Sequence, residues 1–162
     1  MIRGISMKTY LAGLLMALFA LMTPALASEL VLKHGAVATT LVTQGSDGHQ
    51  VGDMRVGHFE VLNAEGKPEG QLNAVLITTA IDTPAPGEEI RMATLTFVLN
   101  DGHTLVVEGA GPYPKKGGTF APGSKQVRAI TGVTGKYAGM TGWCESAHDA
   151  DGNWTHTFHF VK

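Results

Sequence analysis

Glycines inside a β-branched hairpin constrain the fold of this chain more than any other feature of its sequence. Residues 128–131 and 136–145 form two runs that flank a glycine-bounded turn, and the second run contains Gly139 and Gly142. Glycine within a strand usually marks a bulge, a tight bend or a close approach of two backbones. We therefore expect this hairpin to form a corner of a small closed barrel.

The rest of the chain after residue 27 also has the pattern of strands, without helical periodicity. Short alternating or β-branched runs recur between clusters of Gly, Asp, Asn and Pro. The predicted strands are residues 30–42, 53–62, 70–81, 91–99, 104–109, 126–131, 136–146 and 154–161. Eight strands joined mostly by hairpins, with no helix to cover a sheet, favour an all-β fold, an eight-stranded antiparallel β-barrel. A two-sheet sandwich is the competing architecture.

The first 27 residues have the features of a signal peptide. Arg3 and Lys8 precede an apolar segment at residues 11–22 that is too short to span a bilayer, and Ala25-Leu26-Ala27 forms a cleavage site. We expect a secreted or periplasmic protein whose mature part, residues 28–162, is a single barrel domain.

Charge and cysteine content exclude several classes of partner. Of the 12 lysines and arginines, Arg3 and Lys8 fall in the signal segment, so ten remain against 14 acids, a net charge of about −4. A weakly acidic domain without a basic stripe argues against nucleic acid, and against membrane binding after signal cleavage. Cys144 is the single cysteine, so there is no internal disulfide framework.

Several segments resemble the plant dirigent proteins and the allene oxide cyclase barrel superfamily. Residues 130–139 (ITGVTGKYAG) resemble the motif I-T-G-G-T-G-x-Y/F-x-G, residues 96–109 resemble a strand pair of the cyclases, and residues 154–160 resemble the closing strand. The resemblance implies an eight-stranded barrel around an apolar cavity, a homotrimer, and chemistry without a cofactor. Two departures weaken any transfer of chemistry: Ala110 replaces an arginine common in dirigents, and residues 30–42 contain no acid.

The expected function is binding of a small, largely apolar molecule in the barrel lumen. The barrel would promote its isomerisation, cyclisation or stereocontrolled coupling without a cofactor. The alternative is a carrier that holds its ligand without changing it. A third class, a structural protein acting through its outer surface, predicts a lumen filled by side chains.

Glu108 is the predicted catalytic residue. It shares a strand face with Thr104 and Val106. If that face points inward, desolvation would make the carboxyl group suitable for general acid–base catalysis. An outward orientation would make it an ordinary surface charge.

The predicted ligand contacts are Arg91, Tyr113, Trp154, His156 and Phe158. Arg91 alternates with apolar residues and would pair with Glu108 or lie at the wet end of its strand. Trp154, His156 and Phe158 share one strand face, which is either core or a surface for stacking a planar ligand. Tyr113 falls in a long Gly- and Pro-rich connection, residues 110–123, that would be a lid or a mobile surface loop.

No metal site is expected. His156 and His159 are three residues apart and therefore point to opposite faces of one strand. His58 and Glu60 share a face and would form an acid–base pair or, as we favour, part of a solvated surface.

Overall fold

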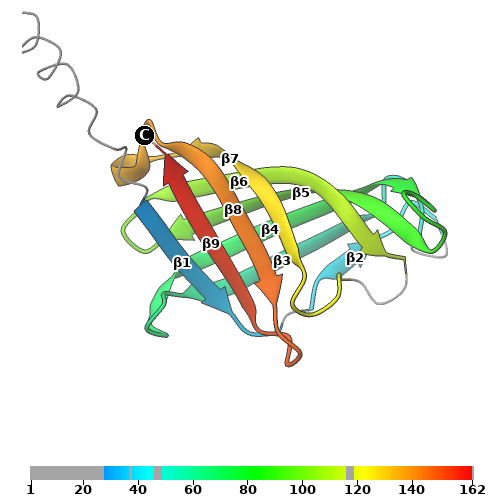
Figure 1. The fold of residues 1–162 in the computed structure, drawn as a ribbon, viewed down its shortest axis with the longest axis horizontal. Helices are drawn as coiled ribbons and strands as arrows, with labels where there is room; N and C mark the ends of the chain where they lie inside the picture. Colours follow the sequence, from blue (N-terminus) through cyan, green and yellow to red (C-terminus); the bar gives the residue numbers. More distant parts are fainter. Residues whose placement is uncertain (1–27, 37, 46–48, 116–118, 162) are drawn as a thin grey trace, which may run out of the picture.

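The computed structural model describes residues 28–36, 38–45, 49–115 and 119–161, so the predicted signal peptide lies outside the described residues. Within the described part, nine strands form a single antiparallel sheet (Figure 1). They are β1 (Ser28–His34), β2 (Thr40–Val42), β3 (Met54–Leu62), β4 (Pro68–Ile81), β5 (Glu88–Leu99), β6 (Thr104–Pro114), β7 (Lys125–Val133), β8 (Thr141–His148) and β9 (Trp154–Val161). No helix among the described residues is long and apolar enough to cross a membrane.

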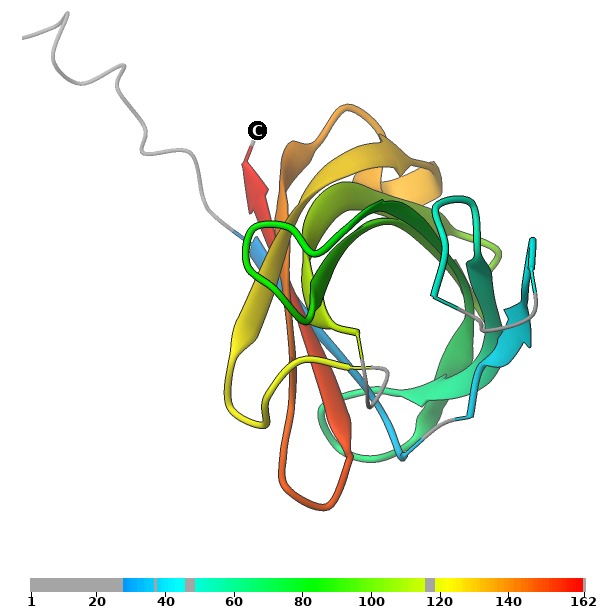
Figure 2. The same ribbon diagram turned by 90° about the vertical axis from the view of Figure 1, so that its right-hand side faces the viewer.

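The sheet closes on itself through β1 and β3. β1 pairs with β9 along its whole length and meets β3 where Lys33 pairs with Leu62, while β2 pairs with the opposite end of β3. β1 and β2 thus run along one edge of β3 as a single interrupted strand, which leaves eight positions in the ring (Figure 2). The prediction of an eight-stranded antiparallel barrel is confirmed, although residues 30–42 are not one continuous strand.

The glycine hairpin differs from the prediction in its connection. A 3-10 turn, η1 (Gly135–Tyr137), replaces the expected start of the second strand, and β8 begins only at Thr141. Gly135 has φ of 60°, a left-handed conformation that glycine adopts without strain. Gly142 lies against β9, and a Cβ atom there would be 1.9 Å from the His159 carbonyl oxygen. The expected close backbone approach therefore occurs at Gly142.

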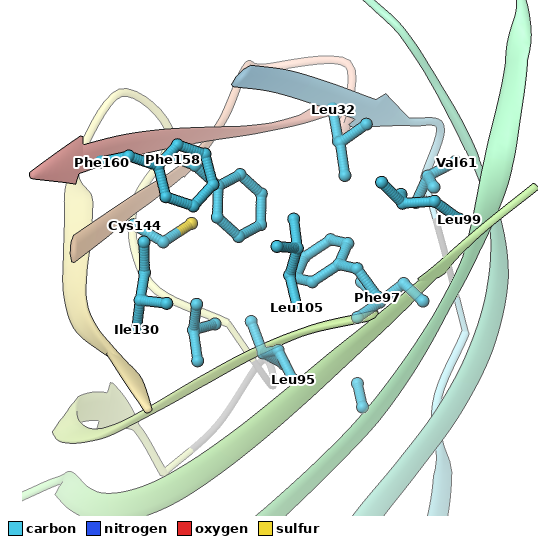
Figure 3. Packing of buried hydrophobic residues seen from close by; sticks show 13 residues of the cluster. Leu32, Val61, Leu95, Phe97, Leu99, Leu105, Ile130, Cys144, Phe158 and Phe160 are labelled. Atoms are coloured by element: carbon cyan, nitrogen blue, oxygen red, sulfur yellow. The ribbon is translucent and has the colours of Figure 1, made fainter. Parts of the chain in front are cut away.

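The barrel interior is packed in one half. Phe97, Leu105, Phe158 and Phe160 are fully buried there, with Phe97 and Phe158 in an edge-to-face contact at 5.0 Å between ring centroids (Figure 3). These side chains come from β5, β6 and β9, whose inward positions alternate with outward ones. Burying a side chain of this size contributes about 1.5–3 kcal/mol. This apolar core closes one end of the lumen.

Candidate functional site

The other half of the barrel contains a cavity of about 260 Å³. It is lined by inward side chains near the start of β5 and β9 and near the end of β6 and β8. Part of the lining is apolar, from Phe59, Leu72, Ala74, Leu76, Leu95 and Trp154. The remaining lining residues are polar or charged, which is unusual for the interior of a small domain.

Three arginines from alternate strands line the cavity. Arg55 of β3, Arg91 of β5 and Arg128 of β7 are 8%, 0% and 5% exposed, respectively. Each occupies an inward position in its strand. Buried guanidinium groups are costly unless they are paired, so the partners of each arginine decide what the site requires.

Glu89 pairs with two of these arginines. Its Oε1 atom accepts from Arg91 Nε at 2.5 Å and lies 3.2 Å from Arg55 Nη2. The Thr78 hydroxyl donates to the same oxygen at 3.3 Å and accepts from Arg55 Nη1 at 3.3 Å. Glu89 and Arg91 are two residues apart on β5 and so share its inner face. The expected pairing of Arg91 with Glu108 is wrong, as is a wet position for Arg91, because Arg91 is fully buried against Glu89.

Arg128 contacts a tyrosine rather than an acid. Its Nη2 atom donates to the Tyr113 hydroxyl at 2.6 Å. The Arg91 guanidinium lies over the ring of Tyr113, 4.5 Å from its centroid. Tyr113 therefore lies between two cationic groups inside the cavity. It belongs to β6 and not to a loop, because the strand extends to Pro114.

Ser146, His156 and His34 form a hydrogen-bonded chain across β8, β9 and β1. His34 Nδ1 lies 2.8 Å from the Gly35 carbonyl oxygen, an acceptor, so this nitrogen must carry a proton. In neutral His34, Nε2 is then the acceptor for His156 Nε2–H at 3.1 Å. His156 Nδ1 in turn accepts from the Ser146 hydroxyl at 2.9 Å. The chain thus has one direction, from Ser146 to Gly35.

Burial keeps this chain neutral. Desolvation lowers the pKa of His34 and holds the pKa of His156 well below its usual value of 6.5, with further lowering from the charges of His34 and Arg128. Burial also raises the pKa of the adjacent Cys144 thiol to about 12, so Cys144 is protonated and unreactive.

Phe120 lies beside the cavity. It is buried and contacts the rings of Tyr113 and Trp154 at 5.7 and 5.4 Å between centroids. His148 Nε2 lies 2.7 Å from the Phe120 carbonyl oxygen, and His148 Nδ1 lies 2.9 Å from the Asp149 carbonyl oxygen. Of the predicted 110–123 connection, residues 110–114 belong to β6 and residues 116–118 lie outside the described residues.

The inward orientation expected for Glu108 is wrong. Glu108 is exposed on the outer face of β6, where it accepts a hydrogen bond from the Thr94 hydroxyl at 3.0 Å. The inward residues of that strand are Leu105 and Val107, on the opposite face. Glu108 therefore has no access to the lumen. His58 and Glu60 also lie exposed on the outer face, consistent with a solvated surface.

The other predicted contacts divide between cavity and core. Arg91, Tyr113, Trp154 and His156 line the cavity, whereas Phe158 belongs to the apolar core beyond it. Within the described part of the chain, no group of three or more His, Cys, Asp or Glu residues has the arrangement of a metal site.

Sequence reasoning missed five polar residues of this region: His34, Arg55, Glu89, Arg128 and Ser146. A usable signal existed for Arg128, which shares a strand face with Ile130, and for His34, which follows Leu30 and Leu32 at alternate positions. Glu89 carried no such signal because the predicted strand began at Arg91.

No protein-family model matches the chain, and no curated protein matches its sequence. Solved structures share its fold. A pyocyanin demethylase superposes with a TM-score of 0.65 at 19% identity, over 83% of this chain and 100% of its own. The Diels-Alderase AbmU from Streptomyces koyangensis gives 0.59 at 16% identity, over 100% of this chain and 84% of its own. A pterocarpan synthase dirigent protein gives 0.52 at 12% identity, over 83% and 86%. The barrel fold is thus shared with dirigent and cyclase-type proteins.

Proposed function

We propose that the protein binds a small, largely apolar molecule in its lumen and promotes an isomerisation, cyclisation or stereocontrolled coupling of it without a cofactor. The observation that carries this proposal is the cavity of about 260 Å³, in which an apolar lining meets the Ser146–His156–His34 chain. Its volume is near the lower end of ligand pockets, about 300–1,000 Å³, and suits a compact ring system.

Restraint of the ligand would supply most of the rate. A ligand held against Leu72, Ala74 and Trp154 loses most of its conformers before reaction, which converts binding energy into reactive geometry. The fixed polar groups would then select one of several products.

The histidine chain would move a proton without net change. Ser146 Oγ takes a proton from one ligand atom as its own hydroxyl proton passes to His156 Nδ1, and His156 Nε2–H passes its proton to His34. Reversal of these transfers returns the proton to a second ligand atom, so an isomerisation is balanced. Neutral imidazoles suit this role because each has one donor and one acceptor nitrogen.

Two solved structures of the same fold support the proposed class of cofactor-free reactions. The names of two structural neighbours describe a Diels-Alderase and a pterocarpan synthase dirigent protein. A carrier function is the second candidate, and one observation favours it. The side chains of Ser146, His156 and His34 are already hydrogen-bonded to one another and to the Gly35 carbonyl, so none of the three offers a free base in the absence of ligand.

Ligand extraction from matched variants separates these functions. We would extract the small molecules that co-purify with wild type, His156→Gln and the surface control His58→Gln, and identify them by mass spectrometry. A catalyst predicts that the His156→Gln protein retains a molecule that added wild-type protein and His58→Gln both convert. A carrier predicts one unchanged molecule in all three extracts. An empty lumen in all three would contradict both.

We also propose that the protein is exported and trimeric. The basic start, short apolar segment and Ala25-Leu26-Ala27 site support cleavage before Ser28, and the dirigent and cyclase resemblance supports a homotrimer. N-terminal sequencing of the exported protein should begin at Ser28, and sedimentation equilibrium should give three times the chain mass. An uncleaved or monomeric product would contradict the respective proposal.

A further inference from the structure

We propose that the lumenal ligand carries an acidic group, either a carboxylate or an equivalent oxyanion. Arg128 and Tyr113 form the subsite that binds this group. This inference rests on the proposed lumenal binding and specifies the chemical class of the ligand. It depends on the partners of the buried arginines, because Arg55 and Arg91 share Glu89 whereas Arg128 pairs with no carboxylate among the described residues.

Among the described residues, Arg128 is the cavity arginine that has no carboxylate partner. Arg55 and Arg91 both contact Glu89, whereas no carboxylate of the described residues lies within 4.0 Å of Arg128. Its Nε atom is buried and has no hydrogen-bond partner in the part of the chain that the structure describes. A guanidinium that is 95% buried and hydrogen-bonded to a neutral hydroxyl destabilises the folded protein, because its charge is desolvated without a counter-charge. An anion from outside the protein would offset that cost.

Neighbouring groups do not supply the missing negative charge. Cys144 lies directly across the β7–β8 pair from Arg128, but burial keeps its thiol protonated. His156 is neutral and gives no negative charge in any state. Glu145 is on the outer face of β8, where it pairs with Lys125. Within the described part of the chain, the counter-charge is therefore open to a ligand.

The surroundings of Arg128 are those of a built site. Gly109 faces inward on β6, and a Cβ atom there would be 3.1 Å from Arg128 Cγ, so glycine leaves room for the arginine stem. The Tyr113 hydroxyl accepts from Arg128, which leaves its own hydrogen to donate. An oxyanion in the cavity would thus receive charge-assisted hydrogen bonds from Arg128 and one from Tyr113.

The same cavity also excludes a purely polar ligand. Its lining includes Leu72, Leu76, Leu95 and Trp154, which favour an apolar ring or chain. The class of ligand that satisfies both parts is a compact aromatic or cyclic acid with a single anionic group.

Matched acids and amides test this class directly. Benzoate, cinnamate and 2-naphthoate would each be titrated calorimetrically against wild-type protein, beside benzamide, cinnamamide and 2-naphthamide, which have nearly the same shape without the charge. For the best-fitting pair we expect the acid to bind about 10- to 100-fold more tightly than the amide. Acids and amides that bind within threefold of each other would overturn the inference and leave lumenal binding intact. Binding by none of the six would overturn the proposed function and this inference together.

Variants assign the preference to the subsite. Arg128→Met should reduce the acid-to-amide ratio to below threefold, and Tyr113→Phe should reduce it partly. Lys125→Met is the control, since it removes one charge from the same strand at a side chain that is 62% exposed. It should keep the full ratio. A preference for acids over amides that survives in a folded Arg128→Met protein would refute the assignment to this subsite. A melting curve of each variant establishes that it is folded. The wild-type ratio tests the ligand class even if that variant does not fold.

Discussion

Replacement of Glu89 by glutamine should destabilise the fold by about 3–5 kcal/mol, the cost of leaving buried charges uncompensated. The carboxylate is fully buried, and its Oε1 atom accepts from Arg91 Nε and Thr78 Oγ1 and faces Arg55 Nη2. Glutamine has nearly the same shape but removes the negative charge. Two guanidinium groups would then remain in the lumen without their shared partner.

Urea unfolding measures this loss. For a slope of about 2 kcal/mol per M, the midpoint should fall by roughly 1.5–2.5 M with the slope unchanged. The control is Glu108→Gln, the same change at an exposed carboxylate that accepts a hydrogen bond from the Thr94 hydroxyl. It should alter the free energy of unfolding by about 0.5 kcal/mol or less.

A loss below about 1 kcal/mol in Glu89→Gln would refute the reasoning. It would mean that water or a rearrangement of Arg55 and Arg91 compensates for the missing charge, and that the lumen is not the dry environment inferred from their burial. An equal loss in Glu108→Gln would show instead that the assay reports net charge.

Three further predictions test the barrel itself. Gly142→Ala should lower the free energy of unfolding by about 3 kcal/mol or more, because φ is 142° and the new Cβ would meet the His159 carbonyl. The control Gly132→Ala should be tolerated, since the nearest contact of its new Cβ is at 3.4 Å. Equal urea midpoints for the two variants would contradict this prediction. Phe158→Ala should cost about 3–5 kcal/mol in the same assay, against less than about 1 kcal/mol for the exposed Val127→Ala. Since burial lowers the pKa of His156 below 6.5, the unfolded chain binds its proton more readily, and stability should fall as pH drops below about 6.5. A wild-type pH profile no steeper than that of His156→Gln would disprove this last prediction.

Much of the barrel follows from local sequence because strand alternation is a local property. Alternation on β9 brought Trp154, His156 and Phe158 to one face, and the structure has all three pointing inward. Turn residues also marked most hairpins. The division of that face between cavity and core was not predictable, because it depends on how far the side chains of other strands reach across the lumen.

The prediction for Glu108 failed because alternation defines two faces without saying which one is buried. Closure of the ring turns Leu105 and Val107 inward, and Glu108, on the other face of the strand, therefore points outward. The network at Glu89 was missed for a related reason. The predicted strand began at Arg91, yet Glu89 pairs with Tyr113 of β6 and thereby extends β5.

Tyr113 was assigned to a loop because prolines flank it. In the structure β6 pairs with β7 only as far as Glu108, so Pro112 and Pro114 lie on a stretch bonded to β5 alone. A strand edge tolerates residues without an N–H group. The contact between Tyr113 and Arg128 depends on this tertiary arrangement and has no counterpart in the local sequence.

The most direct test of the central claim is a crystal structure of the protein with cinnamate. Lumenal binding of an acidic, largely apolar molecule predicts the ring against Trp154 and Leu72, with a carboxylate oxygen about 3 Å from the Arg128 guanidinium and the Tyr113 hydroxyl. Cinnamate bound only on the outer surface, or bound in the lumen with its carboxylate away from Arg128, would contradict it.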